Sequence, residues 1–255
     1  MAQSQEIEWL LREKYSGEKS EAFFADCKRL SLGEPLAYLI GWAPFLDTKM
    51  YLDTKPLIPR PETEFWVAEA IKVIKNSATL PLGLVETKPL KILDLCAGSG
   101  CIGVAVAKAL PECLVDFAEL DSKHLFTIEK NIKENNIEQK RTRAIHSNLF
   151  SNTPGSYDFI FSNPPYIDET LHRTDRGVRE HEPYVALFGG IDGLEIIAQL
   201  ITDAPAHLQP GGQLWIEHEP EQSEAIAKQA AKHHFTATTH KDQYGVERYS
   251  ILVLQ

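Results

Sequence analysis

The sequence has few positive charges and lacks long apolar runs. Over 255 residues, 26 Lys and Arg stand against 36 Asp and Glu, a formal net charge of −10. That balance argues against a large phosphate-binding surface, because affinity for nucleic acid depends mainly on Lys and Arg. No apolar run approaches the roughly 20 residues that span a bilayer, and residues 1–8 lack the basic start and apolar core of a signal peptide. We therefore expect a cytoplasmic protein without direct nucleic-acid binding, to which a basic protein partner is better suited.

Recognisable cysteine and histidine sites are also missing. The four cysteines form no CxxC pair, and nothing points to an oxidising compartment, so free thiols are expected. The nine histidines are scattered, without HExxH or a Cys/His cluster, so no metal site is predicted. With 43% hydrophobic and 24% charged residues, the chain has the composition of a globular protein, and its length allows one ordinary domain plus a small one.

From residue 91 onward, short apolar runs alternate with stretches of helical period, which predicts a parallel sheet with crossover helices. The expected strands are 91–96, 114–119, 143–146, 157–162 and 213–217, and the expected helices are 102–110, 122–135, 193–208 and 221–233. The segment Pro210-Gly211-Gly212 is expected to make the turn into the last parallel strand. Segments 235–239 and 248–254 indicate an antiparallel pair at the sheet edge. The prediction is an α/β fold with a doubly wound, mostly parallel sheet of seven strands.

The first 90 residues have a different character. Residues 5–32 indicate one or two short helices, and residues 36–58, rich in Pro, Gly and aromatics, indicate an extended or hairpin connection. A further helix is expected to begin at Pro61, a residue suited to the first helical position. Residues 76–89, with Pro81, Gly83 and Pro89, predict a loop.

A glycine-bearing turn follows the first expected strand of the sheet. The run from Ile92 to Leu95 leads through Cys96 and Ala97 into Gly98-Ser99-Gly100 and then a helix. Glycines let a ligand approach the backbone, and a helix start offers unpaired N–H groups. The GxGxxG of a dinucleotide fold is absent, and a purely structural turn has the same Gly-x-Gly pattern.

An acidic residue ends the next expected strand. Glu119 lies 19 positions after Gly100, and a carboxylate there can accept hydrogen bonds from both ribose hydroxyls of an adenosine. Asp121 is the neighbouring candidate, but alternation along the strand puts Glu119 at its mouth. A single acid at a strand end is usually only solvated, so Glu119 gains its meaning from the glycine turn beside it.

The tetrapeptide Asn163-Pro164-Pro165-Tyr166 follows the apolar run 157–161. An Asn oxygen and a proline carbonyl are both acceptors, and Pro164 and Pro165 carry no competing backbone N–H. Such a pair can hold and polarise a planar nitrogen, whose delocalised lone pair makes it a poor nucleophile, for methylation. A plain turn after a strand is the alternative for the tetrapeptide alone. Together with the glycine turn and Glu119, however, it would lie at the carboxyl ends of three strands, where open α/β sheets bind ligands.

These motifs resemble the class I S-adenosylmethionine-dependent methyltransferases and, among them, the release-factor glutamine methyltransferases. The resemblance covers nearly the whole chain. It is carried by the segments 33–41 (GEPLAYLIG), 57–64 (LIPRPETE), 92–100 (ILDLCAGSG), 163–167 (NPPYI), 178–183 (VREHEP), 189–194 (GGIDGL) and 210–212 (PGG). The PRPETE stretch is specific to this subfamily, whereas NPPY is shared with DNA adenine methyltransferases.

The resemblance implies a small helical N-terminal domain (1–35) that docks the substrate, a hairpin linker (36–60) and a methyltransferase domain (61–255). The implied substrate is the glutamine of the Gly-Gly-Gln motif in a class I peptide chain release factor, and the implied cofactor is S-adenosylmethionine. The residues implied to bind the cofactor are Asp94, Cys96, Ala97, Gly98, Ser99 and Gly100 at its methionine end, Glu119 at its ribose, and Asn148 with Leu149 at its adenine, with Asn163 beside the methyl group. A monomer is expected.

In the implied reaction, Asn163 Oδ1 and the Pro164 carbonyl accept the two amide hydrogens of the glutamine, and Tyr166 packs on the flat amide. No catalytic acid or base is assigned, because a methylated amide is acidic enough to lose its proton to water. Arg60 is expected either to face the ligands or to support the turn of Glu62 and Glu64. The run Glu180-His181-Glu182 is expected to structure a loop or contact a partner.

Three departures from the family pattern stand out. Cys96 replaces the glycine that usually begins the turn, which gives the backbone less freedom. Asn148 stands where Asp is common, and its amide can still pair with adenine. The N-terminal domain is also short. The rival functions are a DNA or RNA adenine N6-methyltransferase, for which no basic target-recognition region is left over, and a non-catalytic binding module.

Overall fold

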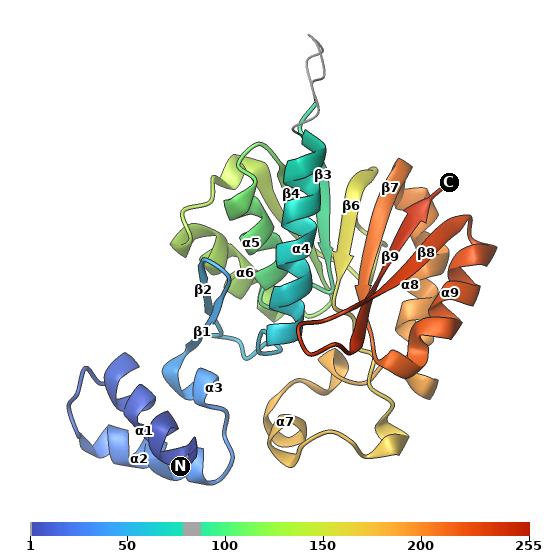
Figure 1. Cartoon of the computed structure of the whole chain (residues 1–255). Helices are drawn as coiled ribbons and strands as arrows, with labels where there is room; N and C mark the ends of the chain where they lie inside the picture. Colours follow the sequence, from blue (N-terminus) through green and yellow to red (C-terminus); the bar gives the residue numbers. More distant parts are fainter. Residues whose placement is uncertain (1, 79–87) are drawn as a thin grey trace.

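The structure, a computed structural model, describes residues 2–78 and 88–255 (Figure 1). Its centre is a sheet with the strand order β5-β4-β3-β6-β7-β9-β8. The strands are β3 (Lys91–Leu95), β4 (Leu114–Glu119), β5 (Thr142–His146), β6 (Tyr157–Ser162), β7 (Leu208–Glu217), β8 (Phe235–Lys241) and β9 (Glu247–Leu254). β3 to β7 run parallel, and β9 is antiparallel to both of its neighbours. The predicted seven-stranded, mostly parallel sheet with an antiparallel edge is confirmed.

Helices cover both faces of this sheet. On one face lie α4 (Pro61–Ala78), α5 (Cys101–Ala109) and α6 (Ser122–Glu134), which share one hydrophobic core with the sheet. On the other face, α8 (Glu195–Asp203) and α9 (Ser223–Lys232) form a second core. The strand order places β3 between β4 and β6. The chain passes from β3 to β4 and β5 on one side and then returns to β6 on the other side of β3, so a ligand crevice is expected at the carboxyl ends of β3, β4 and β6.

The N-terminal residues form a separate small cluster at the lower end of Figure 1. The helices α1 (Ala2–Glu13), α2 (Glu21–Ser31) and α3 (Leu36–Ile40) pack around Leu10, Phe23, Leu30 and Leu39. A hairpin of β1 (Trp42–Phe45) and β2 (Thr48–Tyr51) leads from them to the sheet domain.

The hairpin is fastened to α6 by two asparagines that imitate a neighbouring strand. Asn131 accepts a hydrogen bond from the backbone N–H of Tyr51 (2.7 Å) and donates one to its carbonyl (3.0 Å). Asn135 makes the same pair of bonds with Lys49 (3.1 and 2.9 Å). Asn131 also donates to the carbonyl of Ser99 (2.9 Å), so one side chain joins the hairpin to the glycine turn.

Several local expectations were wrong. Residues 36–40, expected to be extended, form the helix α3, which is flanked by Pro35 at its start and by Gly41, with φ of 93°, at its end. A helix of five residues is too short to show a helical period in the sequence. The expected helix 193–208 is regular only over 195–203. At its start, Asp192 and Gly193 have positive φ, and at its end a 3-10 turn over 204–207, which contains Pro205, replaces the α-helix. Residues 210–212 form a bulge inside β7, which already begins at Leu208. The sequence also gave no sign of α7 (Arg176–His181).

The helix predicted to begin at Pro61 does begin there, with Glu62 and Glu64 in its first turn. It continues to Ala78, so residues 76–78 of the expected loop 76–89 are helical, and residues 79–87, which include Pro81 and Gly83, lie outside the described residues. Within residues 2–78 and 88–255, no helix combines the length and apolarity needed to cross a membrane. No group of three or more potential metal ligands was found among the same residues.

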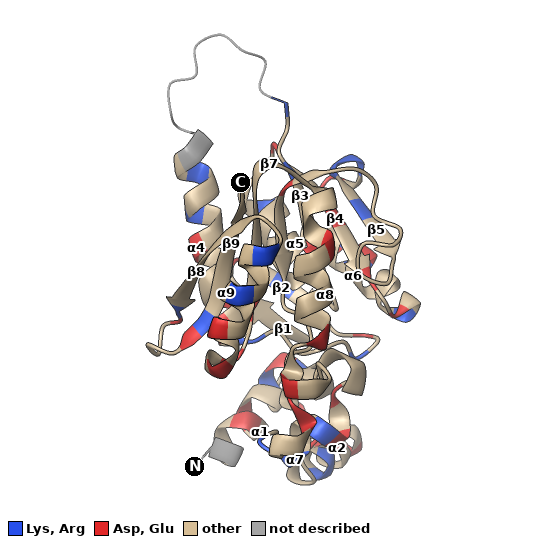
Figure 2. Cartoon of the chain, turned by 90° about the vertical axis from the view of Figure 1, so that its right-hand side faces the viewer, with Lys and Arg blue, Asp and Glu red and all other residues tan. Residues whose placement is uncertain are grey.

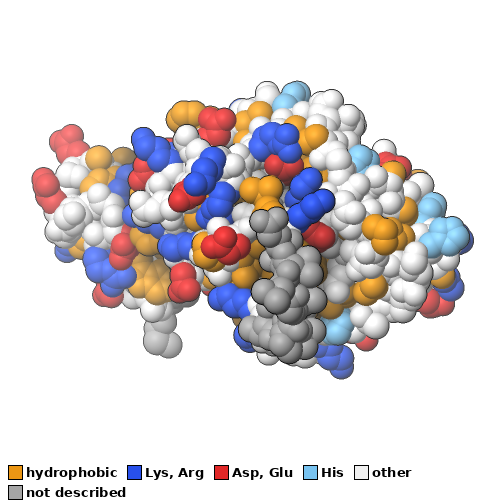
Figure 3. Space-filling view, turned by 90° about the horizontal axis from the view of Figure 1, so that it is seen from above, with side chains coloured by type: hydrophobic (Ala, Val, Ile, Leu, Met, Phe, Trp, Pro, Cys, Tyr) orange, Lys and Arg blue, Asp and Glu red, His pale blue; other side chains and the backbone are white. Residues whose placement is uncertain are grey.

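Charges are spread over the surface. Figure 2 shows positions of Asp and Glu close to positions of Lys and Arg on several helices, among them α7. α7 lies close to the end of α2, since a Cβ atom on Gly177 would lie 3.2 Å from the Gly33 carbonyl oxygen. Figure 3 looks onto the end of the molecule at the top of Figure 1, where Lys and Arg are interspersed with Asp and Glu. This end holds a cavity lined by Lys91, Lys140, Arg141 and Arg143, away from the strand ends that carry the predicted site.

Candidate active site

Asn163 begins the tetrapeptide directly after β6 and borders two cavities. One cavity, of about 230 Å³, is lined by Asn163, Pro164 and Tyr166 together with Arg60 and residues of the segment 167–187. The other, of about 120 Å³, is lined by Asn163 together with the glycine turn, Glu119, Asn148 and Leu149. Leu57 and Ala186 also line both. The arrangement has room for two different ligands that meet at Asn163.

The acceptors predicted in the tetrapeptide are available. Asn163 Nδ2 donates a hydrogen bond to Thr63 Oγ1 (3.1 Å). Within the described residues, neither Asn163 Oδ1 nor the Pro164 carbonyl takes part in a hydrogen bond. Both oxygens can therefore accept hydrogens from a ligand in the cavity. Pro165 lines the smaller cavity and Pro164 the larger one.

The glycine turn has the conformation of a ligand-binding loop. Cys96, Gly98 and Gly100 have φ of 62°, 56° and 78°. At Cys96 this left-handed conformation costs roughly 1–2 kcal/mol more than at the glycine that usually stands there. Gly100 caps α5 without a side-chain hydrogen bond, and in the first turn of the helix the N–H of Gly103 is instead bonded to Asp94.

Glu119 lies against this turn at the mouth of β4. Its Oε2 accepts from the N–H of Gly98 (2.7 Å) and its Oε1 from the N–H of Asp121 (2.8 Å). Burial raises the pKa of the Glu119 carboxyl, and these two N–H groups oppose the shift. Each carboxylate oxygen keeps a second lone pair, so both can still accept from ligand hydroxyls.

Four residues predicted to contact the cofactor lie behind the turn and do not line either cavity. Asp94 is fully buried, and its Oδ2 accepts from the N–H of Gly103 in α5 (2.8 Å). Burial raises the pKa of Asp94 to about 8. Ala97, Ser99 and Gly100 are buried as well. Asp94 thus holds the start of α5 beneath the turn in this structure, and direct cofactor contacts by these four residues stay a prediction.

Asn148 and Leu149 follow β5 at the far side of the smaller cavity. Asn148 is exposed, and Leu149 is buried with φ of 45°. Leu149 belongs to the second hydrophobic core, and its carbonyl accepts from Ser147 Oγ (2.6 Å). The buried side chain of Leu149 beside the exposed amide of Asn148 suits a flat base with polar edges.

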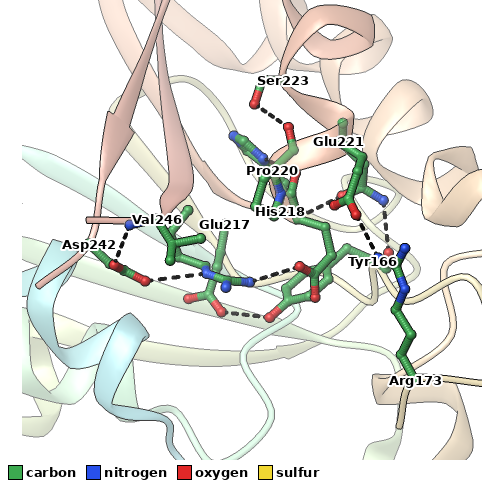
Figure 4. Close-up of polar contacts among 12 residues, drawn as sticks. Tyr166, Arg173, Glu217, His218, Pro220, Glu221, Ser223, Asp242 and Val246 are labelled. Atoms are coloured by element: carbon green, nitrogen blue, oxygen red, sulfur yellow. Dashed lines mark hydrogen bonds and ion pairs between the residues drawn. The ribbon is translucent and has the colours of Figure 1, made fainter. Parts of the chain in front are cut away.

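Tyr166 is tied to a buried carboxylate that the sequence did not single out (Figure 4). Its hydroxyl donates to Glu217 Oε1 (3.0 Å), and its carbonyl accepts from Gln222 Nε2 (2.8 Å). Burial raises the pKa of Tyr166 well above its usual value, so the hydroxyl stays protonated. Glu217 Oε2 also accepts from Thr63 Oγ1 (2.6 Å) and from Trp66 Nε1 (2.7 Å). The ring of Tyr166 is therefore fixed at the cavity wall; its packing on a substrate amide stays a prediction.

The glycine-rich segment 189–194 packs against the backbone of the tetrapeptide. A Cβ atom on Gly189 would overlap the Pro165 carbonyl oxygen, and one on Gly193 would overlap that of Tyr166. Only glycine permits this approach, and Gly193 also has φ of 66°. The segment thereby fixes the path of the residues that carry the acceptors.

Arg60 was expected to face the ligands or to support the turn of Glu62 and Glu64, and the structure pairs it with Glu182. Its Nη2 lies 2.6 Å from Glu182 Oε1, and Glu182 Oε2 accepts from the N–H of Ile58 (3.0 Å). Only 1% of the Glu182 side chain is exposed. Glu182 therefore structures the loop, as expected, while Arg60 lines the larger cavity from the linker side. His181 lines neither cavity.

Several site residues had no assigned role at the sequence level. Leu57 and Thr63 lie in the 57–64 motif, and Val185, Ala186 and Ile196 reach the smaller cavity from the segment after α7. The only sequence sign of Glu217 was an acidic residue at the end of a hydrophobic strand.

Comparison with known proteins agrees with this geometry. Residues 72–179 match a family model described as a methyltransferase small domain. The chain is 33% identical over 249 residues to a release factor glutamine methyltransferase of Lactococcus lactis, covering 95% of this chain and 86% of that protein. It is 38% identical over 207 residues to that of Rhodopirellula baltica (80% and 67%), and 37% identical over 209 residues to that of Francisella tularensis (82% and 70%).

Solved structures show the same fold at lower identity. The hMettl16 catalytic domain superposes with a TM-score of 0.62 at 14% identity, covering 82% of this chain and 76% of that one. The ribosomal protein L11 methylase of Lactobacillus delbrueckii superposes with a TM-score of 0.53 at 17% identity, covering 76% and 78%.

Proposed function

Because the chain belongs to the family of release factor glutamine methyltransferases, we propose that it methylates the side-chain amide nitrogen of the glutamine in the Gly-Gly-Gln motif of a class I peptide chain release factor. The methyl donor is S-adenosylmethionine. The observation that carries the proposal is the position of Asn163, which borders both cavities and keeps its Oδ1 available. We place this activity in the cytoplasm and assign it to a monomer.

The smaller cavity suits the cofactor. Glu119 offers two acceptor oxygens for ribose hydroxyls, and the start of α5, where Asp94 takes the N–H of Gly103, offers its remaining N–H groups for the carboxylate of the methionine part. Asn148 and Leu149 suit the adenine. When bound, S-adenosylmethionine would supply a methyl group on a positively charged sulfur. The methyl group would pass to the glutamine nitrogen, and the sulfur would retain the electrons of the broken carbon–sulfur bond.

The larger cavity suits the glutamine and its neighbouring residues. Asn163 Oδ1 and the Pro164 carbonyl would accept the two hydrogens of the carboxamide and turn its nitrogen toward the smaller cavity. The same oxygens stabilise positive charge as it develops on that nitrogen. Positioning of this kind contributes roughly 7–11 kcal/mol in well-oriented systems. The chain needs no catalytic base here, because the methylated amide can release its proton to water.

A nucleic-acid adenine methyltransferase is less well supported. It would have to hold a flipped base and its strand. The charges around the strand ends are mixed, and the net charge is −10. The four-residue basic lining described above lies at the other end of the sheet.

The test measures transfer of a radiolabelled methyl group by the wild-type protein to three substrates: a release factor, the same factor with alanine in place of the Gly-Gly-Gln glutamine, and duplex DNA. Only the first should be labelled. Replacement of Asn163 by Ala should lower transfer by roughly 100-fold or more, as for loss of one hydrogen-bonding group that stabilises a transition state. Cofactor affinity, measured separately by calorimetry, should change little. Labelling of DNA in place of the release factor, or near-wild-type transfer by the Asn163→Ala variant, would contradict the proposal.

A further inference from the structure

A buried carboxylate beneath the tetrapeptide has no role in the function described so far. Glu217 ends β7 with 1% of its surface exposed. Its Oε2 accepts from Thr63 Oγ1 and Trp66 Nε1. Its Oε1 accepts from the hydroxyl of Tyr166 (Figure 4). An indole nitrogen can only donate, so Oε2 accepts from Trp66. As a carboxylate, Glu217 has no proton to give, so it also accepts from Thr63 and Tyr166.

The hydrogen bonds have a fixed direction from Glu217 to Asn163. The Thr63 hydroxyl has one proton, and it gives that proton to Glu217 Oε2 at 2.6 Å. The remaining lone pairs of Thr63 Oγ1 can only accept, so the group 3.1 Å away must be the NH₂ of Asn163. The other edge of the same amide, Oδ1, is then the one turned to the cavities.

Without the hydroxyl, nothing in this contact would distinguish the two edges of the Asn163 amide. The oxygen and nitrogen ends of an asparagine are nearly equal in size, and their orientation is set by the hydrogen-bond network. A flipped Asn163 would present an NH₂ group to the NH₂ group of a carboxamide substrate. Two donors cannot pair, so the acceptor required for transfer would be lost.

We propose that Thr63 and Glu217 are positioning residues that hold Asn163 with its oxygen toward the substrate, an inference that rests on the proposed function. The same carboxylate holds the hydroxyl of Tyr166. Glu217 thus fixes the side chains at both ends of the tetrapeptide through contacts that involve no ligand. Thr63 is fully buried and lines neither cavity, so it acts only through Asn163.

The first experiment compares Thr63→Val, which removes the hydroxyl and keeps the shape, with Thr63→Ser, which keeps the hydroxyl. We expect Thr63→Val to lower kcat for release-factor methylation roughly 10- to 100-fold, part of the effect of losing a transition-state hydrogen bond. KM for the release factor and the Kd of S-adenosylmethionine should stay within about twofold, because a docked protein is held mainly by contacts away from the reacting amide. Thr63→Ser should restore most of kcat.

The control is Thr153→Val. Thr153 is also buried, and its hydroxyl donates to the Phe150 carbonyl (3.0 Å), but it lines neither cavity. Its loss should lower the melting temperature without changing kcat. If Thr63→Val does not fold, Thr63→Ala removes the same hydroxyl with different packing. Wild-type kcat in a folded Thr63 variant that lacks the hydroxyl would overturn the proposal, as would equal losses in Thr63→Val and Thr63→Ser.

A second readout needs no substrate. The side-chain NH₂ signals of Asn163, assigned in an NMR spectrum by their absence in Asn163→Ala, should shift or broaden in Thr63→Val and return in Thr63→Ser. This result would hold even if the wild-type protein did not methylate a release factor, so failure of the inference and failure of the proposed function can be told apart. Unchanged Asn163 signals in Thr63→Val would overturn the inference alone.

Discussion

Asp94 should make the stability of the protein fall as the pH rises. Its carboxyl is fully buried, and burial raises its pKa from the ordinary aspartate value of 3.8 to about 8. Between about pH 4 and pH 8 the folded chain therefore keeps a proton that the unfolded chain releases. Ionisation then favours the unfolded state, and this contribution to the free energy of unfolding falls by up to about 1.4 kcal/mol per pH unit within that window.

The measurement is urea unfolding at several pH values for the wild-type protein and for Asp94→Asn, which cannot ionise. The wild-type curve should descend more steeply than that of Asp94→Asn between about pH 5 and pH 7, and the two slopes should agree above pH 8. Parallel curves across the whole window would show that the carboxyl is ionised in the folded protein.

Single residues can be predicted from the sequence when their role depends on their position at the end of a strand. They cannot be predicted when their role depends on a side chain that is distant in the sequence. Asn163 and Glu119 could be singled out because each follows an expected strand and their place at the sheet edge needs no further information. Thr63 contacts Glu217 across 154 positions and Asn163 across 100. Such pairs become visible only when α4 is packed against the ends of β6 and β7. The burial of Asp94 behind the glycine turn likewise depends on α5, whose Gly103 supplies its partner.

At the scale of elements, the junction of the hairpin with α6 can be tested with two matched substitutions. Asn131→Ala removes hydrogen bonds to both backbone groups of Tyr51 and to the Ser99 carbonyl. Asn135→Ala removes the equivalent pair at Lys49. Each should destabilise the protein by roughly 1–3 kcal/mol in urea unfolding, because partly buried backbone groups lose their partners.

Only Asn131→Ala should also weaken cofactor binding, since Asn131 alone holds the glycine turn through Ser99. Titration calorimetry with S-adenosylmethionine checks this. Equal affinities in the two variants would mean that the turn keeps its shape without the Asn131 contact.

The elements that the sequence failed to predict share a physical cause. The helices α3 and α7 have five and six residues, fewer than two turns, so neither repeats its apolar pattern. The bulge in β7 is set by its pairing with β6, where the register shifts between Tyr157 and Phe159. By contrast, β4 and β6 have the predicted bounds, because each is a compact apolar run bounded by polar or breaking residues.

Across the whole molecule, the ion pair of Arg60 and Glu182 joins the linker before α4 to the segment that closes the larger cavity. Arg60→Ala would leave Glu182, 1% exposed, without its charged partner. We expect a loss of roughly 2 kcal/mol in the free energy of unfolding, the size of a hydrogen bond to a charged group. The Arg60→Ala/Glu182→Gln double variant should recover part of this loss, because the unpaired charge is gone. Chemical denaturation of Arg60→Ala, Glu182→Gln and the double variant measures these free energies of unfolding. If the loss in the double variant equals the sum of the losses in the two single variants, the two side chains do not stabilise each other.

The overall architecture was predictable because a parallel sheet imposes its pattern on every strand and crossover helix. The N-terminal cluster was predictable only in outline, since its core consists of a few side chains such as Leu10, Phe23 and Leu30. How it lies relative to the sheet depends on contacts such as those of Asn131, which no local pattern encodes.

Asn131 grips the hairpin strand and the Ser99 carbonyl with a single amide group. A protein partner that bound the hairpin and displaced Tyr51 would therefore be expected to displace the glycine turn as well, through Asn131. By linkage, such a coupling is reciprocal: the factor by which the partner changes the affinity for the cofactor equals the factor by which the cofactor changes the affinity for the partner.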